Sequence, residues 1–370
     1  MGVEAPSGTL SLRALNRATL ARQALLERAR LEPQELIECL GGLQAQAPNP
    51  PYVALWARLA SFQREELTRL LEQKRVVRSA LMRGTLHLAT AQDYLAFRPL
   101  IQPVLTRGHK GAWGKFLQGL DPMEVATAGC TLLAEMPLTS NDLGKRLQKQ
   151  WPEYDPKALA QAVRNFGSLI HVPPAGTWGA HPNPRLTPAA IWLGKTRTPE
   201  GSLEALALRY LSAFGPASAK DLGTWCGLTG LSPVLEALRP QLQSFRDESG
   251  RELFDLPDAS RPDPETPAPP RLLSEFDNLL LSYADGSRIL APEHRRAVMT
   301  VNGLVSATIL VDGFVCGTWN LERGKGRALV RVSPFAALRK TDRAALEAEG
   351  QRFLAFAGVE GEVAFTAPGS

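Results

Sequence analysis

The sequence predicts an α+β protein in which three helical repeats, each ending in a β-hairpin, precede a β-rich C-terminal region. Three observations support this fold class. Segments with helical spacing of apolar residues are followed three times, before residue 257, by short alternating or turn-rich segments. The proline-rich stretch 257–270 then interrupts regular structure. Beyond it, strand-like alternation around Asn-Gly and Asp-Gly pairs dominates.

The composition describes a foldable and mildly basic protein. The chain has 370 residues, of which 44% are hydrophobic, so it is long enough for two or three domains with buried cores. Lys and Arg (42) exceed Asp and Glu (37), giving a net charge of +5. Such an excess permits a nucleic-acid partner but does not demonstrate one.

Cysteine usage and the N-terminus indicate a cytoplasmic protein. The four cysteines and five histidines are scattered, without a CxxC pair or zinc-site spacing, so we expect reduced thiols, no metal and no cofactor. The first residues, "MGVEAPSGTL", lack the pattern of a signal peptide, and no apolar stretch approaches the length of a membrane span. We therefore expect no membrane association.

The first repeat is expected at residues 1–110. Helical spacing is seen in "LRALNRATLARQALLERAR", in "PQELIECL" with proline at its start, in "PPYVALWARL" and in "EELTRLLEQ". The segment "VVRSALMRGTLHLAT" then alternates around a glycine, which predicts a β-hairpin.

The same order returns at residues 111–198 and 199–256. The second repeat has helices in "PMEVATAGCTLLAEM", "TSNDLGKRLQ" and "PKALAQAVRNFG", then the hairpin segment "SLIHVPPAGTWGAHPNPRLTP". The third has "SLEALALRYLSAF", "ASAKDLGTWCGL" and "LSPVLEALRPQL", then "QSFRDESGRELFDL". The short helices of both repeats share "DLG", at residues 142–144 and 221–223.

Helix, short helix, helix and two-stranded hairpin is the order of a winged helix-turn-helix module. One occurrence would be weak support, whereas three in succession strengthen it. In DNA-binding modules of this kind a helix fits the major groove and the wing touches the minor groove, so the pattern favours duplex DNA as partner. Winged helices also act as protein–protein scaffolds, and the pattern alone leaves that alternative open.

The C-terminal region, residues 271–370, is expected to hold hairpins closed by a helix. Asn302-Gly303 and Asp312-Gly313 are strong turn signals, "ERGKGR" is a third, and "TDRAALEAEGQRFLAFAG" predicts the closing helix. The third turn places three cations at a hairpin tip: Arg323, Lys325 and Arg327. Such a tip could contact phosphates or enter a minor groove; a solvated turn is the alternative.

A second set of DNA-binding residues is expected in the first hairpin. Strand alternation places Arg83, Thr85 and His87 on one face, which would give the wing a basic and polar surface. A histidine in such a position is otherwise a structural residue.

Familiar catalytic signatures are missing. The chain has no Walker loop, GxGxxG, GxSxG or HExxH motif. From periodicity alone, Gln44 and Gln46 in "LQAQAP" read as polar loop residues between a helix and a proline. Glutamine is neither a preferred metal ligand nor a general base, so the local pattern assigns this pair no chemistry.

Four segments together nevertheless resemble a known family. They are "LNRATLARQALLERAR", "GLQAQAPNPPYVALWARL", "LMRGTLHLATAQDY" and "LLSEFDNLLLSYADGSRI". The chain resembles, from about Leu12 to the closing helix, the winged-helix DNA glycosylases of the AlkZ-like group. The resemblance implies three tandem winged helices on duplex DNA and excision of alkylated purines, including bulky N7-alkylguanine adducts and interstrand crosslinks.

The resemblance also implies the site. The family's catalytic motif is Gln–apolar–Gln or Gln–apolar–Asp, and Gln44-Ala45-Gln46 matches the first form. A DNA-inserting hairpin is expected as well, which we place at Trp319 to Val330. No lysine adjoins the motif, so we expect a monofunctional base-excision enzyme. We also expect it to work as a monomer. The alternative is a non-enzymatic winged-helix DNA-binding protein, such as a transcription regulator.

Overall fold

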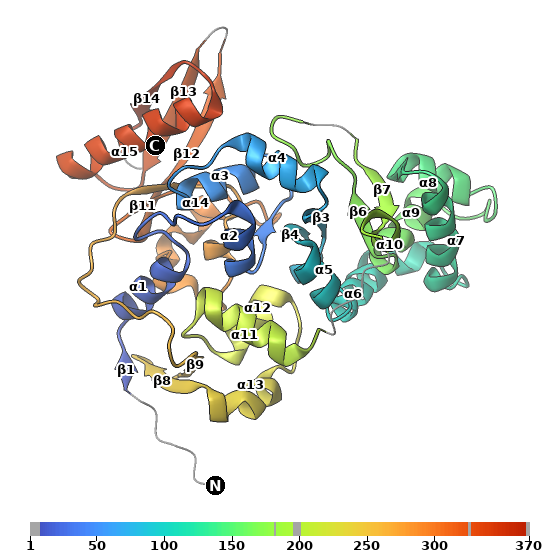
Figure 1. Cartoon of the computed structure of the whole chain (residues 1–370), viewed down its shortest axis with the longest axis horizontal. Helices are drawn as coiled ribbons and strands as arrows, with labels where there is room; N and C mark the ends of the chain where they lie inside the picture. The colour runs from blue at the N-terminus through green and yellow to red at the C-terminus, as the bar shows by residue number, and fades with distance from the viewer. Residues whose placement is uncertain (1–7, 181–182, 195–200, 325–326, 368–370) are drawn as a thin grey trace.

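The structure is a computed structural model that describes residues 8–180, 183–194, 201–324 and 327–367. Figure 1 shows the first predicted repeat in the middle of the molecule, the second at one end and the third below. The C-terminal sheet lies on the opposite side from the second repeat. No helix in the described part of the chain is long and apolar enough to cross a membrane.

The N-terminal segment packs against parts of the chain far away in sequence. Strand β1 (Thr9–Leu10) pairs in parallel with strand β8 (Gln243–Asp247) of the third repeat. Helix α1 (Leu12–Arg22) begins at Ser11, whose hydroxyl accepts a hydrogen bond from the Ala14 amide. The sequence pattern predicted a longer helix here. It ends after Arg22 because Ala24 adopts a left-handed conformation, with φ of 52°.

The first repeat consists of three helices and one short strand, followed by the hairpin. In order these are α2 (Pro33–Cys39), β2 (Leu43–Gln44), α3 (Pro50–Arg58), α4 (Arg64–Glu72), β3 (Val76–Ala80) and β4 (Leu86–Thr90). The sheet order is β2-β4-β3 with antiparallel neighbours, so the predicted hairpin is confirmed. Helices α2 and α4 each start with a capping box, which satisfies backbone amides at the helix start.

The second repeat has the same order. Its elements are α7 (Pro122–Glu135), β5 (Leu138–Thr139), α8 (Ser140–Leu147), α9 (Pro156–Phe166), β6 (Leu169–His171) and β7 (Arg185–Pro188), with sheet order β5-β7-β6. Helices α5 (Ala91–Phe97) and α6 (Gln102–Trp113) lead into it, and α10 (Ala189–Trp192) follows. Side chains of Asp121, Thr139 and Asp155 accept hydrogen bonds at the three helix starts.

The third repeat differs only in its first strand. It contains α11 (Leu203–Phe214), α12 (Ala219–Cys226), α13 (Ser232–Leu238), β8 (Gln243–Asp247) and β9 (Glu252–Asp255), and sheet order β1-β8-β9. A single bridge between Ala217 and Phe254 stands where the other repeats have a short strand.

The shared "DLG" has a physical explanation. Asp142 and Asp221 occupy the third position of their helices, where their backbone amides donate to the capping hydroxyls of Thr139 and Ser218. The leucines that follow are buried. At Gly144 a Cβ atom would lie 2.2 Å from the Pro156 carbonyl oxygen, so a side chain would push the next helix away.

The C-terminal region forms a five-stranded sheet in the order β10-β11-β12-β13-β14. The strands are β10 (Arg271–Leu273), β11 (Thr308–Val311), β12 (Phe314–Arg323), β13 (Ala328–Pro334) and β14 (Gly361–Phe365), and the region also has helices α14 (Arg295–Val298) and α15 (Lys340–Ala357). The predicted turn at Asp312-Gly313 joins β11 to β12, with φ of 49° and 82°. The predicted closing helix is followed by β14, which pairs in parallel with β13.

The proline-rich segment 257–270 contains no helix or strand, as its composition predicts. It is nevertheless attached to the body: the Arg17 guanidinium donates to the Thr266 carbonyl at 2.7 Å, and Arg261 pairs with Asp255. The segment therefore follows a fixed path over helix α1.

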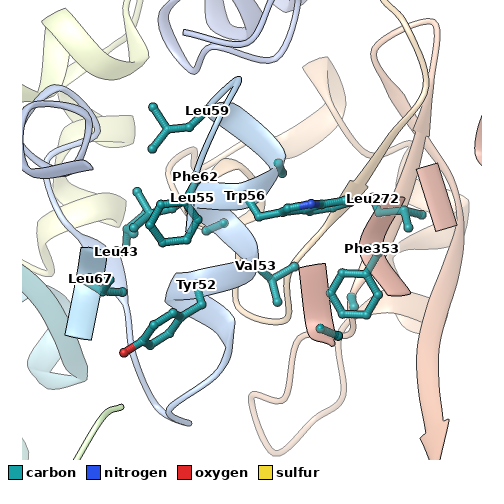
Figure 2. Close-up of a cluster of buried hydrophobic side chains, with 14 of the residues drawn as sticks. Leu43, Tyr52, Val53, Leu55, Trp56, Leu59, Phe62, Leu67, Leu272 and Phe353 are labelled. Atoms are coloured by element: carbon teal, nitrogen blue, oxygen red, sulfur yellow. The ribbon is translucent and has the colours of Figure 1, made fainter. Parts of the chain in front are cut away.

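Helix α3 forms the centre of a core shared by the first repeat and the C-terminal sheet. All nine of its residues are buried. Figure 2 shows Tyr52 and Leu55 beside side chains of the first repeat, whereas Trp56 points towards Leu272 and Phe353. The Trp56 and Phe353 rings meet edge to face, with centroids 5.4 Å apart. Burial of each such side chain contributes roughly 1.5–3 kcal/mol, so the two regions stabilise each other.

Arg58, the last residue of helix α3, forms a buried ion pair. The Arg58 guanidinium donates two hydrogen bonds, of 2.9 and 2.7 Å, to the Asp277 carboxylate, and both side chains are 1% exposed. The pair fixes the segment 274–278, which follows strand β10, against α3. Because both side chains are shielded from bulk solvent, each charge depends on the other for compensation.

Asp277→Ala should lower the free energy of unfolding by about 3–5 kcal/mol, because the Arg58 guanidinium would stay buried without its partner. Urea unfolding followed by circular dichroism measures the change. Glu322→Ala is the matched control: it breaks a half-exposed 2.7 Å pair with Arg331 and should cost less than about 1 kcal/mol. Equally small effects in both variants would contradict the assigned importance of the buried pair.

Candidate functional site

The two motif glutamines lie on strand β2 and just after it. Successive side chains of an extended strand point to opposite faces, and here Leu43 and Ala45 enter the core. Gln44 and Gln46 therefore share the other face, where Gln44 is buried and Gln46 is exposed. Hydrophobic alternation thus explains why one small apolar residue separates them.

The motif continues from strand β2 into a segment that the other repeats lack. In the second repeat, Thr139 of the corresponding strand caps the next helix directly, and Ser218 does so in the third. In the first repeat the residues 45–49 intervene between β2 and helix α3, which starts at Pro50. Gln44 therefore belongs to the repeated framework, whereas Gln46 lies in an insertion within it.

Asn278 holds the backbone on one side of the motif. Its side-chain Nδ2 donates to the Gly42 carbonyl at 2.7 Å, and its Oδ1 accepts from the backbone N–H of Gln44 at 3.3 Å. The side chain thus takes the place of a neighbouring strand. Asn278 follows Asp277, so the buried ion pair with Arg58 also positions the motif.

Arg78 on strand β3 holds the backbone on the other side. It donates to the carbonyls of Ala45 (2.9 Å) and Gln46 (3.1 Å), and a third bond of 2.9 Å joins it to Nδ1 of His171. Burial, and secondarily the Arg78 charge, lowers the pKa of His171 to about 3. The imidazole is therefore neutral, and its Nδ1 accepts from the guanidinium, which ties strand β6 of the second repeat to the motif.

Arg83 holds the Gln44 side chain itself. Its guanidinium donates to Gln44 Oε1 at 2.7 Å and to the Trp225 carbonyl at 2.6 Å. A guanidinium has no acceptor, so the Gln44 atom facing it must be the oxygen and the amide NH₂ points elsewhere. Gln46 Oε1 is less engaged, accepting a long 3.4 Å bond from the Leu86 amide.

The predicted basic face of Arg83, Thr85 and His87 is arranged differently from simple alternation. Arg83 lies in a one-turn helix, Met82–Gly84, and strand β4 begins only at Leu86, because Arg83 (φ 57°) and Gly84 (φ 71°) adopt left-handed conformations. The Thr85 hydroxyl donates to the Met82 carbonyl. The side chains of Arg83 and Thr85 are half-buried.

His87 pairs directly with Gln44 across strands β4 and β2 and is 1% exposed. Burial, with a smaller contribution from the Arg83 charge, lowers its pKa to about 3. Its neutral ring donates from Nδ1 to the Thr85 carbonyl at 3.1 Å. The structure therefore brings Gln44, Arg83 and His87 together, while DNA binding by Arg83, Thr85 and His87 stays a prediction.

The predicted DNA-contacting hairpin is formed by β12 and β13 and extends away from the body in Figure 1. Arg323 ends β12, and Arg327 directly precedes β13; both are exposed. Lys325 lies outside the described residues. The hairpin is far from Gln44 in sequence, but Arg323 reaches a groove beside the motif.

This groove, which we call the motif groove, has a volume of about 550 Å³. Ala47, the residue immediately after Gln46, is one of the residues that line it. Its walls come from the first repeat, the second repeat and the C-terminal region. They include Pro48, Asn49, Trp178, Glu275, Trp319 and Arg323. Among the described residues, no group of three or more His, Cys, Asp or Glu side chains could hold a metal ion.

Sequence reasoning missed the residues that support the motif. Arg78, Glu275 and Asn278 were not assigned roles from the sequence alone. The signal for two of them was available in "SEFDN", a polar cluster between two apolar runs. Without the tertiary contact between this segment and β2, the cluster could not be connected to the glutamines.

Comparison with known proteins identifies the class. The model of the family "DNA glycosylase AlkZ-like" matches residues 37–356, and the chain therefore belongs to the AlkZ-like DNA glycosylases. A curated relative, the "Interstrand DNA cross-link repair glycosylase" of Streptomyces sahachiroi, is 27% identical over 364 residues, spanning 92% of this chain and 95% of the relative. The solved structure of Streptomyces sahachiroi DNA glycosylase AlkZ covers 97% of this chain and 100% of its own, with a TM-score of 0.78 and 24% identity. The predicted family and enzyme class are confirmed.

His171→Asn should weaken the acid sensitivity of the fold. The folded-state pKa of His171 is about 3. The unfolded value is about 6.5, so the unfolded chain binds a proton that the folded chain excludes between these values. The stability is fully present above about pH 6.5 and is lost as pH falls towards 3.

Asparagine retains an acceptor for Arg78 but does not titrate. Between about pH 6 and about pH 4, the free energy of unfolding should therefore fall less steeply in the variant, by about 1.4 kcal/mol per pH unit. Urea unfolding at several pH values gives both slopes. Identical slopes would show that His171 is not buried in its neutral form.

Proposed function

We propose that the protein is a monofunctional DNA glycosylase that hydrolyses the N-glycosidic bond of N7- or N3-alkylated purines in duplex DNA. The observation that carries the proposal is the pair Gln44 and Gln46, of which Gln44 is held by Arg83 and Gln46 directly precedes the groove residue Ala47, in a chain that belongs to the AlkZ-like DNA glycosylases. The curated relative's name refers to interstrand cross-link repair. Bulky and crosslinked purines are therefore included in the proposed substrate class.

We further propose that the three repeats are winged helix-turn-helix modules. Each contains three helices followed by a two-stranded hairpin, and a short strand or single bridge precedes the second helix. We assign them to residues 1–110, 111–198 and 199–256, and the hairpin region to 271–370. Modules of this type support binding of a duplex through helices and wings. We also propose that the protein works as a monomer.

The proposed chemistry uses the lesion's own charge. Alkylation at N7 or N3 leaves a positive charge on the purine, which weakens the bond between C1′ and the base. The bond breaks with its electron pair moving to the base, so a neutral purine leaves and the sugar becomes oxocarbenium-like. Water then adds to C1′ and releases a proton. No base with a tuned pKa is required, so two amides suffice to place the water and stabilise the cation.

The contacts support different roles for the two glutamines. Gln44 Oε1 is held by Arg83, so its amide group is fixed in direction. Gln46 is exposed, and its oxygen is only weakly engaged by the Leu86 amide. We therefore assign Gln46 to holding the attacking water, with Gln44 assisting, and Arg83 to positioning Gln44. The exposed cations Arg323 and Arg327 are assigned to the DNA backbone.

The double variant Gln44→Ala/Gln46→Ala should lose at least about 100-fold in excision rate, the size expected when preorganised polar groups are removed from an active site. The assay measures release from a duplex containing one N7-methylguanine, followed by alkaline cleavage of the abasic site. Gln351→Ala, an exposed glutamine on α15, is the matched control and should keep the wild-type rate.

Gln46→Ala alone should account for most of that loss. Full activity in Gln46→Ala would overturn its assigned role. Absence of product with the wild type on this duplex and on a duplex with a bulky N7 adduct would overturn the proposed function.

Arg83→Met should separate positioning from DNA binding. If Arg83 acts by holding Gln44, the single-turnover rate at saturating protein should fall about 10-fold, with little change in the Kd for DNA. Arg323→Met, in contrast, should weaken binding and reduce the salt dependence of Kd, with a smaller effect on the saturated rate. A pure binding defect in Arg83→Met would instead support the prediction that Arg83 contacts DNA.

A further inference from the structure

The motif groove contains a charged group that the proposed chemistry does not yet use. Glu275 lines the groove together with Ala47 and Pro48, the residues that directly follow Gln46. It is the one carboxylate among the described residues of the groove wall. In the part of the chain that the structure describes, its side chain takes part in no hydrogen bond or ion pair, and burial is the sole cause of its pKa shift.

The backbone fixes the position of Glu275. The next residue, Phe276, has a left-handed conformation with φ of 55°, which is strained for a side chain of this size. Asp277 and Asn278 hold this conformation through the buried pair with Arg58 and the two hydrogen bonds to the motif backbone. The same short segment therefore positions both the glutamine motif and Glu275.

The surroundings of Glu275 are suited to a cation. Trp178, Trp319 and Phe353 contribute aromatic walls to the groove. The Glu275 side chain is exposed, and the partial desolvation that it experiences raises the pKa of its carboxyl above the ordinary value. The other charged side chain of the described groove wall, Arg323, is exposed and forms no ion pair with it. In such a groove, the carboxylate attracts a positive ligand by Coulombic interaction and the aromatic rings attract it by cation–π interaction.

We propose that Glu275 is a specificity-determining residue that recognises the positive charge of the alkylated purine in the motif groove. This inference rests on the proposed function. The charge is on the base before cleavage and moves to the sugar as the bond to C1′ breaks. An unpaired carboxylate at the groove wall therefore attracts the lesion throughout the step, whereas a neutral purine of the same shape gains nothing from it.

The test compares binding of two duplexes that differ only in lesion charge. One carries N7-methylguanine and the other its neutral isostere 7-methyl-7-deazaguanine, both on a 2′-fluoroarabinose that resists hydrolysis. The full-length wild type should bind the cationic duplex at least about 10-fold more tightly, a difference of about 1.4 kcal/mol. Glu275→Gln should reduce this preference to near unity, and Glu275→Asp should retain part of it.

Glu293→Gln provides the matched control, because it removes the same charge from an exposed site outside the groove wall. It should keep the wild-type preference. Urea unfolding of each variant checks that the fold is retained.

Two results would overturn the inference: a preference that survives in Glu275→Gln, or a wild type that binds both duplexes equally. Excision of N7-methylguanine from ordinary duplex by the wild type is measured in parallel. If excision occurs while Glu275→Gln keeps the preference, the proposed function stands and the role of Glu275 fails. If no lesion is excised, the proposed function fails independently of the binding result.

Discussion

The buried pair between Arg58 and Asp277 is the constraint on which the site depends. It joins the end of the most buried helix of the first repeat to a segment more than two hundred residues later in the chain. That segment carries Asn278, which completes the hydrogen bonding of the motif backbone, and Glu275, which lines the motif groove. A buried ion pair constrains its geometry strictly, because separating the charges would leave each of them desolvated and uncompensated. The pair therefore transmits the rigidity of the core to the glutamines.

Arginines surround the motif for structural reasons rather than as free cations. Arg78 donates its hydrogen bonds to backbone carbonyls and to a neutral histidine, and Arg83 donates to Gln44 and another carbonyl. Carbonyl and amide oxygens carry only partial charges, so burial lowers the pKa of each arginine to about 10. Both stay protonated near neutral pH. Their positive charges would disfavour a cationic lesion, and the negative charge of a nearby unpaired carboxylate would oppose this repulsion.

The three repeats show how one framework accommodates a site only once. All three place a short strand or bridge before their second helix, and in two of them the capping residue follows immediately. The first repeat instead inserts residues 45–49, and the second repeat covers the insertion: the Gly179 amide donates to Asn49 at 2.8 Å, and His171 contacts Arg78. The third repeat contributes the Trp225 carbonyl that anchors Arg83. The repeats therefore act together on one site in the first of them.

The sequence by itself determined the helices, hairpins and turns, because apolar spacing, capping residues and turn residues such as Asp312-Gly313 at left-handed positions act locally. It also supplied the resemblance that singled out Gln44 and Gln46. It could not show that helix α1 ends early, that β14 follows α15, or that His87 is buried, since neighbours distant in the chain decide these features. Only the tertiary structure decided which charges are paired. Arg58 is buried and meets Asp277 in the folded core, whereas Glu275 is exposed at the groove beside the motif and has no charged partner among the residues that the structure describes.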